Sequence, residues 1–192
     1  MAPRSVPRFA WWIAAAAAAL ACACLAAILR FGEPRPLRFG AYTDTRFGLS
    51  VSAPPGWTLL RVRRTPYIRE FLIVPPDVKP ADAHTSTYAR LTLRRGAGAQ
   101  SVRRVVDDAQ AAIEREAEEY QVVEQSEAKL SGKPSYSVAT ASTSQSGTRW
   151  VRVTAVENRG MIAVWEQQVV PAAAARNLRR DMDRMLDDFR WR

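Results

Sequence analysis

The first feature of the hydrophobic pattern is an uncharged apolar block that runs from Phe9 to Leu29. As a helix, its 21 residues would span about 31 Å, close to the thickness of a bilayer's hydrocarbon core. Trp11 and Trp12 lie near one end of this block, where indole rings favour the membrane interface. The pattern therefore predicts a transmembrane anchor helix at residues 9–29.

Small side chains dominate the block, and they would allow another transmembrane helix to approach closely. A single, weakly hydrophobic anchor from an alanine-rich proteome is the alternative interpretation. The predicted anchor contacts are Trp11, Trp12, Ala14, Ala18 and Leu25.

Two other interpretations of the block stay open, a cleaved signal peptide and a lipoprotein signal. Ala21-Cys22-Ala23 is a triplet that signal peptidase accepts, and Ala19-Leu20-Ala21-Cys22 loosely resembles a lipobox with lipidation at Cys22. Arginines flank the block on both sides, so local charge does not decide its orientation. We expect the N-terminus inside, because a short basic tail (1–8) precedes the apolar run.

After a Pro-containing linker at 30–38, polar and apolar side chains alternate as in half-buried strands. We expect Thr43-Asp44-Thr45 to form a turn between the first two strands and Trp57 to lie in the core. The strands predicted in this part of the chain lie within 37–52, 57–64, 67–74 and 86–95.

The period then changes to that of a helix. Apolar residues recur at steps of three and four through residues 101–120, with Ser101 as N-cap. Four strands fit between Tyr120 and Val170, separated by glycine-containing turns. Pro171 opens a last helix, whose predicted buried stripe is Leu178, Met182, Met185, Leu186 and Phe189.

This order of elements predicts an α+β fold. The links between strands are short, which favours a mostly antiparallel sheet over a doubly wound parallel one. We expect each helix to cover part of the sheet with its apolar side. The sequence therefore predicts one domain at 39–192, which is large enough to bury a single core.

Three short motifs resemble the PsbP-like family, named for an extrinsic photosystem subunit. They are Phe47–Val51 leading to Pro54-Pro55-Gly56-Trp57, then Leu130–Ser135, and the closing Leu186–Phe189. The resemblance covers residues 40–191. It implies an α-β-α sandwich and the role of a scaffold or accessory domain attached to a membrane complex, and no metal-binding motif is carried across.

The net charge of +9 and the pI near 10.4 bear on which classes of partner the protein can bind. Most basic residues are arginines, which GC-rich coding also produces. From Phe39 onward, 23 basic residues face 18 acidic ones, a balance too mixed for a dedicated nucleic-acid binder. Both cysteines, Cys22 and Cys24, lie in the apolar block, so we expect neither a disulfide nor a cysteine metal site in the domain.

The sequence offers little catalytic chemistry. The single histidine, His84, lies in a predicted loop, and one histidine with two cysteines in the anchor does not make a zinc site. Glu118-Glu119 and Asp187-Asp188 are expected on solvated helix surfaces rather than as an acid–base pair. Gly96-Ala97-Gly98 lacks the remaining residues of a phosphate loop. We therefore predict no catalytic residue, no cofactor and no metal.

Clustered arginines suggest a surface for lipid headgroups or for the acidic face of a partner, against the plain interpretation of a solvated face. We expect Arg61 and Arg63 to share one face of their strand, because side chains along a strand repeat with a period of two. The predicted anionic-surface residues are Arg61, Arg63, Arg64, Arg69, Arg94 and Arg95.

The sequence thus predicts a non-catalytic accessory or assembly subunit of a photosynthetic, respiratory or envelope complex. We expect it to span the inner membrane of a bacterium once, with its domain on the periplasmic or extracellular side and integral membrane proteins as partners. A small-ligand or lipid-binding envelope protein, with a cavity between sheet and helix, is the alternative.

Overall fold

The computed structural model describes residues 35–36, 40–64, 68–79, 86–95, 101–145 and 147–191, all within one compact unit, Pro34–Arg192. These described residues form two sheets and two α-helices. The helices are α2 (Val102–Glu116) and α3 (Ala175–Asp188), the latter preceded by a 3₁₀ turn at Ala172–Ala174.

The strands are β1 (Arg35–Pro36), β2 (Ala41–Asp44), β3 (Leu49–Ser52), β4 (Thr58–Arg64), β5 (Ile68–Val74), β6 (Tyr88–Arg95), β7 (Glu119–Leu130), β8 (Lys133–Ser144), β9 (Gly147–Asn158), β10 (Met161–Val169) and β11 (Arg190–Trp191).

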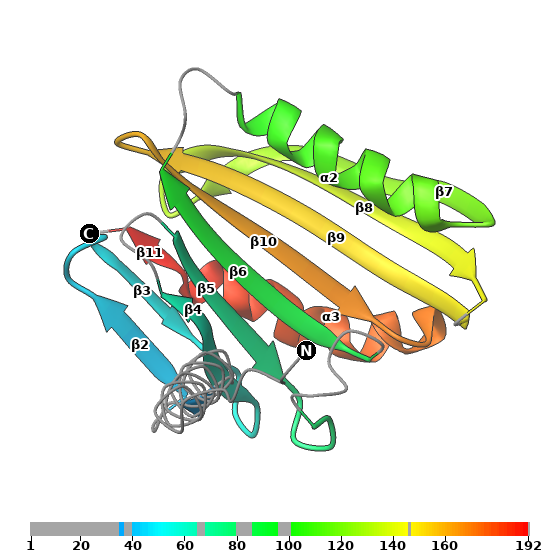
Figure 1. Ribbon diagram of the computed structural model, residues 1–192, viewed down its shortest axis with the longest axis horizontal. Coiled ribbons are helices and arrows are strands. Elements are labelled where there is room, and N and C mark those ends of the chain that lie inside the picture. Colours follow the sequence, from blue (N-terminus) through cyan, green and yellow to red (C-terminus); the bar gives the residue numbers. More distant parts are fainter. Residues whose placement is uncertain are drawn as a thin grey trace, which may run out of the picture. The chain divides into compact units, whose positions relative to one another are not determined.

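Eight strands form the large sheet in the order β1-β4-β5-β6-β10-β9-β8-β7, and three form a small sheet in the order β11-β3-β2. Every strand pairing among the described residues is antiparallel, as predicted. The four long strands from β7 to β10 are joined by tight turns and lie side by side (Figure 1). The prediction of four strands between Tyr120 and Val170 is therefore confirmed.

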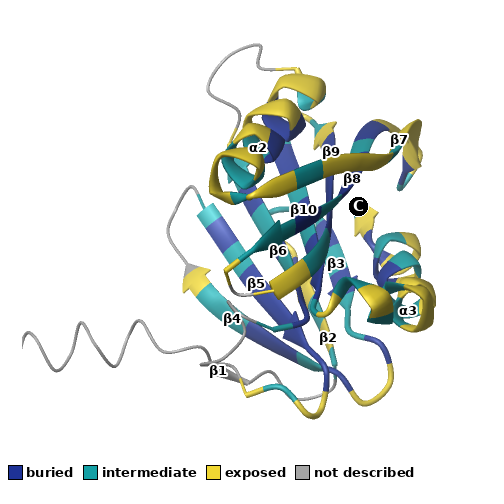
Figure 2. Ribbon diagram, turned by 90° about the vertical axis from the view of Figure 1, so that its right-hand side faces the viewer, coloured by how far each residue is buried: buried dark blue, intermediate teal, exposed yellow. Residues whose placement is uncertain are grey.

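The helices cover opposite faces of the large sheet (Figures 1 and 2). Successive residues of a strand point to opposite faces, and β9 and β10 show the consequence. Val153 of β9 and Ile162 of β10 join the core under α2. Trp165 of β10 joins the core on the other face, which α3 and the small sheet cover.

The core on the α3 face confirms several sequence predictions. Trp57 is buried there, and so are Met182, Met185 and Phe189 of the predicted C-terminal stripe. Leu178 and Leu186 are half-buried and pack against the same cluster. The apolar side of α3 therefore faces the sheet, as its spacing predicts.

The first helix begins as expected but ends earlier. The Ser101 side chain accepts a hydrogen bond from the Arg104 backbone N–H at 3.3 Å, which caps α2. The backbone is extended at Ala117, and Glu118 N–H donates to the Thr143 carbonyl at 2.8 Å. Pairing with β8 thus begins where the prediction continued the helix, and Tyr120 lies in β7.

Three other local predictions differ from the structure. Thr43 and Asp44 belong to β2, and the turn follows at residues 45–48. Arg35 and Pro36, expected in the linker, pair with β4 as β1. The C-terminal residues of β11 pair with β3 and complete a small sheet that the sequence does not predict. The last two differences are long-range strand pairings, which local periodicity does not encode.

Candidate functional site

The most prominent polar feature is a group of cations at one end of the large sheet, which we name the basic end. Strands β4 and β6 both finish there, because β5 runs antiparallel between them. The β7–β8 and β9–β10 turns close at the same end, and α2 begins there, since Arg103 lies over the Tyr136 ring of β8. The exposed cations of the basic end are Arg63, Arg95, Arg103, Arg104, Lys129, Lys133, Arg159 and Arg190.

Two of the predicted surface arginines, Arg63 and Arg95, are exposed at the basic end. Arg61 and Arg94 are half-buried. The backbone of Arg64 lies in β4 beside them, and its side chain lies outside the described part of the structure. Five of the six predicted residues therefore belong to the end of one sheet, although 34 positions of sequence separate Arg61 from Arg95.

The expectation that Arg61 and Arg63 share a face is wrong. Arg61 pairs with Phe71, but Arg63 pairs with Glu70, since a β-bulge interrupts β4 between them. Phe71 and Glu70 are consecutive residues of β5, so their partners point to opposite faces. One inserted residue breaks the period of two on which the prediction depended.

Arg69 is only 2% exposed and does not contribute to the basic surface. Its Nε donates to the Asp44 Oδ2 at 3.3 Å, and its guanidinium carbon lies 4.5 Å from the centre of the Phe47 ring. Asp44 also accepts hydrogen bonds from the Arg46 and Phe47 backbone N–H groups. Arg69 therefore fastens the β2–β3 turn to the large sheet.

Sequence reasoning left out the cations that the two turns and α2 bring to the basic end. Ser131 and Arg159 have φ values of +52° and precede Gly132 and Gly160 at the tight turns. The two glycines were the sequence signal that could have identified these cations. Glycine marks a tight turn, and a tight turn places its neighbours Lys133 and Arg159 at an end of the sheet. Which end each turn joins depends on the strand order.

A cleft of about 420 Å³ opens between α2 and the large sheet. Apolar side chains form part of its lining, from Ala109, Ala112 and Ile113 of α2 and from Val151, Val153 and Val164 of the sheet. Charged and polar side chains complete the lining: Tyr88, Arg90, Glu116, Arg149, Glu166 and Gln168. An apolar surface with a few convergent polar groups is typical of a small-ligand site.

The polar groups of this cleft are paired with one another. The Tyr88 hydroxyl donates to Glu166, and Arg90 lies 3.6 Å from Glu166 and 3.4 Å from Glu70. Arg149 lies 3.6 Å from Glu116. Burial, and then the negative charge of Glu166, raise the pKa of Tyr88 above its ordinary value of 10.0, so the phenol stays neutral at physiological pH.

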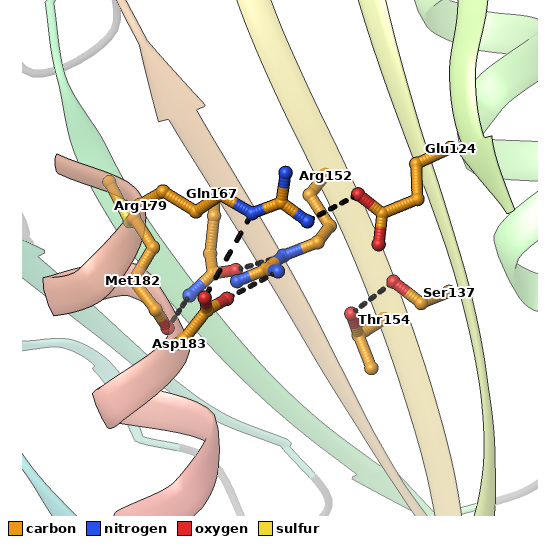
Figure 3. A network of polar contacts seen from close by, with 8 residues as sticks. All are labelled: Glu124, Ser137, Arg152, Thr154, Gln167, Arg179, Met182 and Asp183. Carbon is orange, nitrogen blue, oxygen red and sulfur yellow. Dashed lines mark hydrogen bonds and ion pairs between the residues drawn. The ribbon is translucent and has the colours of Figure 1, made fainter. Parts of the chain in front are cut away.

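A second polar network lies on the opposite face, where α3 meets β9 and β10 (Figure 3). Arg152 donates through Nε to the Gln167 Oε1 at 2.7 Å and through Nη1 to the Asp183 Oδ1 at 2.6 Å. Gln167 in turn donates to the Met182 carbonyl at 2.6 Å. Arg179 of α3 reaches Glu124 of β7 at 2.6 Å. These contacts join α3 to three strands, so their evident role is to position the helix.

The candidate catalytic residues of the sequence are not brought together. Glu118 and Glu119 are exposed where β7 begins, and Asp187 and Asp188 are exposed at the end of α3. His84, Cys22, Cys24 and the Gly96–Gly98 segment lie outside the described residues. Within the described ranges, no group of three or more His, Cys, Asp or Glu side chains is arranged to hold a metal ion.

The predicted anchor also lies outside the described residues, together with its contacts Trp11, Trp12, Ala14, Ala18 and Leu25. Among the helices that the structure does describe, none combines the length and apolarity that crossing a membrane requires.

Solved structures with the same arrangement of elements confirm the PsbP-like fold. Cyanobacterial PsbP (CyanoP) from Synechocystis sp. PCC 6803 aligns with a TM-score of 0.56 at 11% identity, over 79% of this chain and 91% of CyanoP. LpqN, a protein involved in cell envelope biogenesis of Mycobacterium tuberculosis, aligns with a TM-score of 0.54 at 17% identity, over 82% of this chain and 90% of LpqN.

No family model and no curated protein matches the sequence. At these identities the two structures establish the fold, which is a mostly antiparallel sheet with two helices. What the domain does must be argued from its own surface.

Proposed function

We propose that this protein is a non-catalytic accessory subunit of a membrane complex. An anchor at 9–29 would hold it in the inner membrane of a bacterium, with the domain on the periplasmic or extracellular side. The observation that carries this proposal is the basic end, where eight exposed cations from strands, turns and α2 converge on one surface.

Two features of the domain support a binding role over catalysis. Two buried arginines make structural contacts, Arg69 with Asp44 and Arg152 with Asp183. The exposed cations of the basic end form no ion pair between described residues. Unpaired charge on a surface serves recognition and association more than stability.

The test is to purify the full chain from its native membranes in a mild detergent and to identify the proteins that accompany it. We expect it in the membrane fraction after extraction with alkaline carbonate, and in a particle larger than its own mass of 21.4 kDa plus detergent. Recovery of a single copy without companions, or release into the soluble fraction, would contradict the proposal.

A second candidate function is the binding of a small amphipathic ligand in the cleft beneath α2. The apolar side chains of Val151, Val153 and Val164, with Arg90 and Arg149 beside them, favour this alternative. Mass spectrometry of the native protein would test it, since a resident ligand adds a defined mass. An Ala112→Trp substitution, placed at the cleft, should then abolish that added mass.

A further inference from the structure

The charge of the domain is unevenly distributed between the two ends of the large sheet. The basic end carries eight exposed cations, and the acidic side chains among them are Glu127, Glu157, Asp187 and Asp188. Asp107 and Asp108 follow further along α2. At the other end, α2 finishes and β7 begins with four exposed carboxylates, Glu114, Glu116, Glu118 and Glu119, beside exposed Arg115. The first half of α3 adds exposed Arg176, Arg179 and Arg180, so cations and carboxylates are mixed away from the basic end.

The positive charge extends across the sheet. Six strand spacings separate β4 from β7 in the strand order, which corresponds to about 29 Å at about 4.8 Å per spacing. Exposed cations from β4, β6 and both turns lie at intervals across this distance. A surface of that extent fits a broad anionic partner better than a single small anion.

The start of α2 shows that this charge is not arranged for the stability of the helix. Arg103 and Arg104 occupy its first turn, and no acidic residue lies there. The N-terminus of a helix carries partial positive charge, so cations in the first turn are unfavourable. The two arginines therefore add positive potential to the basic end at a cost to the helix.

The register of β1 places the entry of the chain at the same end. Arg35 pairs with Arg61 and Pro36 with Leu60, antiparallel to β4. Arg35 is therefore the residue of β1 that lies toward Arg63 and the basic end. Six peptide steps separate Leu29, the end of the predicted anchor, from Arg35, a reach of about 20 Å at full extension.

We propose that the basic end docks onto the anionic phospholipid headgroups of the membrane that holds the anchor. This inference rests on the proposed anchoring, because the short connection would keep the basic end close to the lipid surface. Guanidinium groups recognise headgroup phosphates through paired N–H donors. An anionic leaflet attracts nearby Lys and Arg, and the attraction fades within a Debye length of about 10 Å at 0.1 M salt.

Hydrogen exchange of the full chain in nanodiscs tests the proposal. One set of nanodiscs contains phosphatidylglycerol and the other only phosphatidylcholine. We expect amides in the turns at 131–132 and 158–160 to exchange at least fivefold more slowly in the anionic nanodiscs at 0.1 M salt. Amides at 144–145, at the other end of the sheet, should not change. Salt at 0.5 M should remove the difference, because it shortens the Debye length.

Charge reversal at the basic end provides the matched comparison. The triple variant Arg63→Glu, Lys133→Glu and Arg95→Glu should lose the lipid-dependent protection. The control triple variant Arg115→Glu, Arg176→Glu and Arg180→Glu reverses the same number of exposed charges away from the basic end and should keep it. Thermal unfolding of both variants verifies that they are folded.

The outcomes separate the two proposals. Equal exchange in both kinds of nanodisc, equal protection at both ends, or protection that survives charge reversal would overturn lipid docking while leaving the anchor in place. Protection that appears only when native membrane proteins are added would assign the basic end to an acidic protein and also overturn lipid docking. A chain that fails to incorporate into either nanodisc would contradict the anchoring instead.

Discussion

The two faces of the large sheet bury different kinds of side chain. Under α3 and the small sheet, large aromatic rings are buried, including Phe71, Trp165 and Phe189. The Trp165 and Phe189 rings meet edge to face, with centroids 5.9 Å apart. Under α2 the buried cluster is mostly aliphatic, with Val105, Val106 and their neighbours, and the cleft opens beside it.

This difference concentrates the buried aromatic surface on one face. Large aromatic side chains remove the most apolar surface from water, so the α3 face should carry most of the folding free energy. The α2 face is packed more lightly and retains space and charged groups at its margin.

The largest expected effect is that of Phe189→Ala on the α3 face. Phe189 is fully buried between the Trp165 and Trp191 rings. Its truncation should lower the free energy of unfolding by about 3–5 kcal/mol through lost transfer energy and a residual cavity. Urea denaturation measures this value. A loss below about 1 kcal/mol would mean that the aromatic cluster does not dominate stability.

The next effect tests the small sheet that belongs to the same face. Arg69→Met leaves Asp44 buried without its cation and should cost about 3 kcal/mol of unfolding free energy. The matched control is Arg63→Met, an exposed residue of the neighbouring strand, which should stay within about 0.5 kcal/mol of the wild type. Similar losses from both variants would remove the assignment of Arg69 to the core.

On the α2 face, Val106→Ala should cost about 1.5 kcal/mol, because it removes two buried carbons at about 0.8 kcal/mol each. Val106 is fully buried against the sheet. Denaturation of this variant beside Phe189→Ala compares the two faces directly. A cost as large as that of Phe189→Ala would show that both faces contribute alike.

The last effect, no larger than that of Val106→Ala, concerns the margin of the cleft. Tyr88→Phe removes the hydrogen bond to Glu166 and should cost about 1.5 kcal/mol at neutral pH. The pKa of Tyr88 is raised above its ordinary value of 10.0, so the folded protein holds this proton more tightly than the unfolded chain. Stability from this group is therefore complete below pH 10 and falls as the pH rises above it.

Between pH 10 and 11, the wild type should lose up to about 1.4 kcal/mol more than Tyr88→Phe, because one differential proton is worth that amount per pH unit. Urea denaturation of both proteins at pH 9 and pH 11 measures the difference. Parallel losses would show that the Tyr88 phenol ionises as readily in the folded protein as in the unfolded chain.

Local pattern in the sequence determined most elements of the domain. Alternation identified the strands, the three- and four-residue spacing identified both helices, and Ser101 fixed the start of α2. Short links between strands predicted an antiparallel sheet, and the structure has one. These features follow from local backbone geometry and from which side of each element is apolar, both of which a short window of sequence contains.

Only the tertiary structure decided the small sheet, the early end of α2, and the bulge that sends Arg61 and Arg63 to opposite faces. It also decided that Arg69 is buried against Asp44 while turn residues such as Lys133 and Arg159 join Arg95 at the basic end. These outcomes depend on pairings between distant residues. The physical reason is that strand order sets which side chains share an end or a core, and periodicity within one strand carries no information about its neighbours.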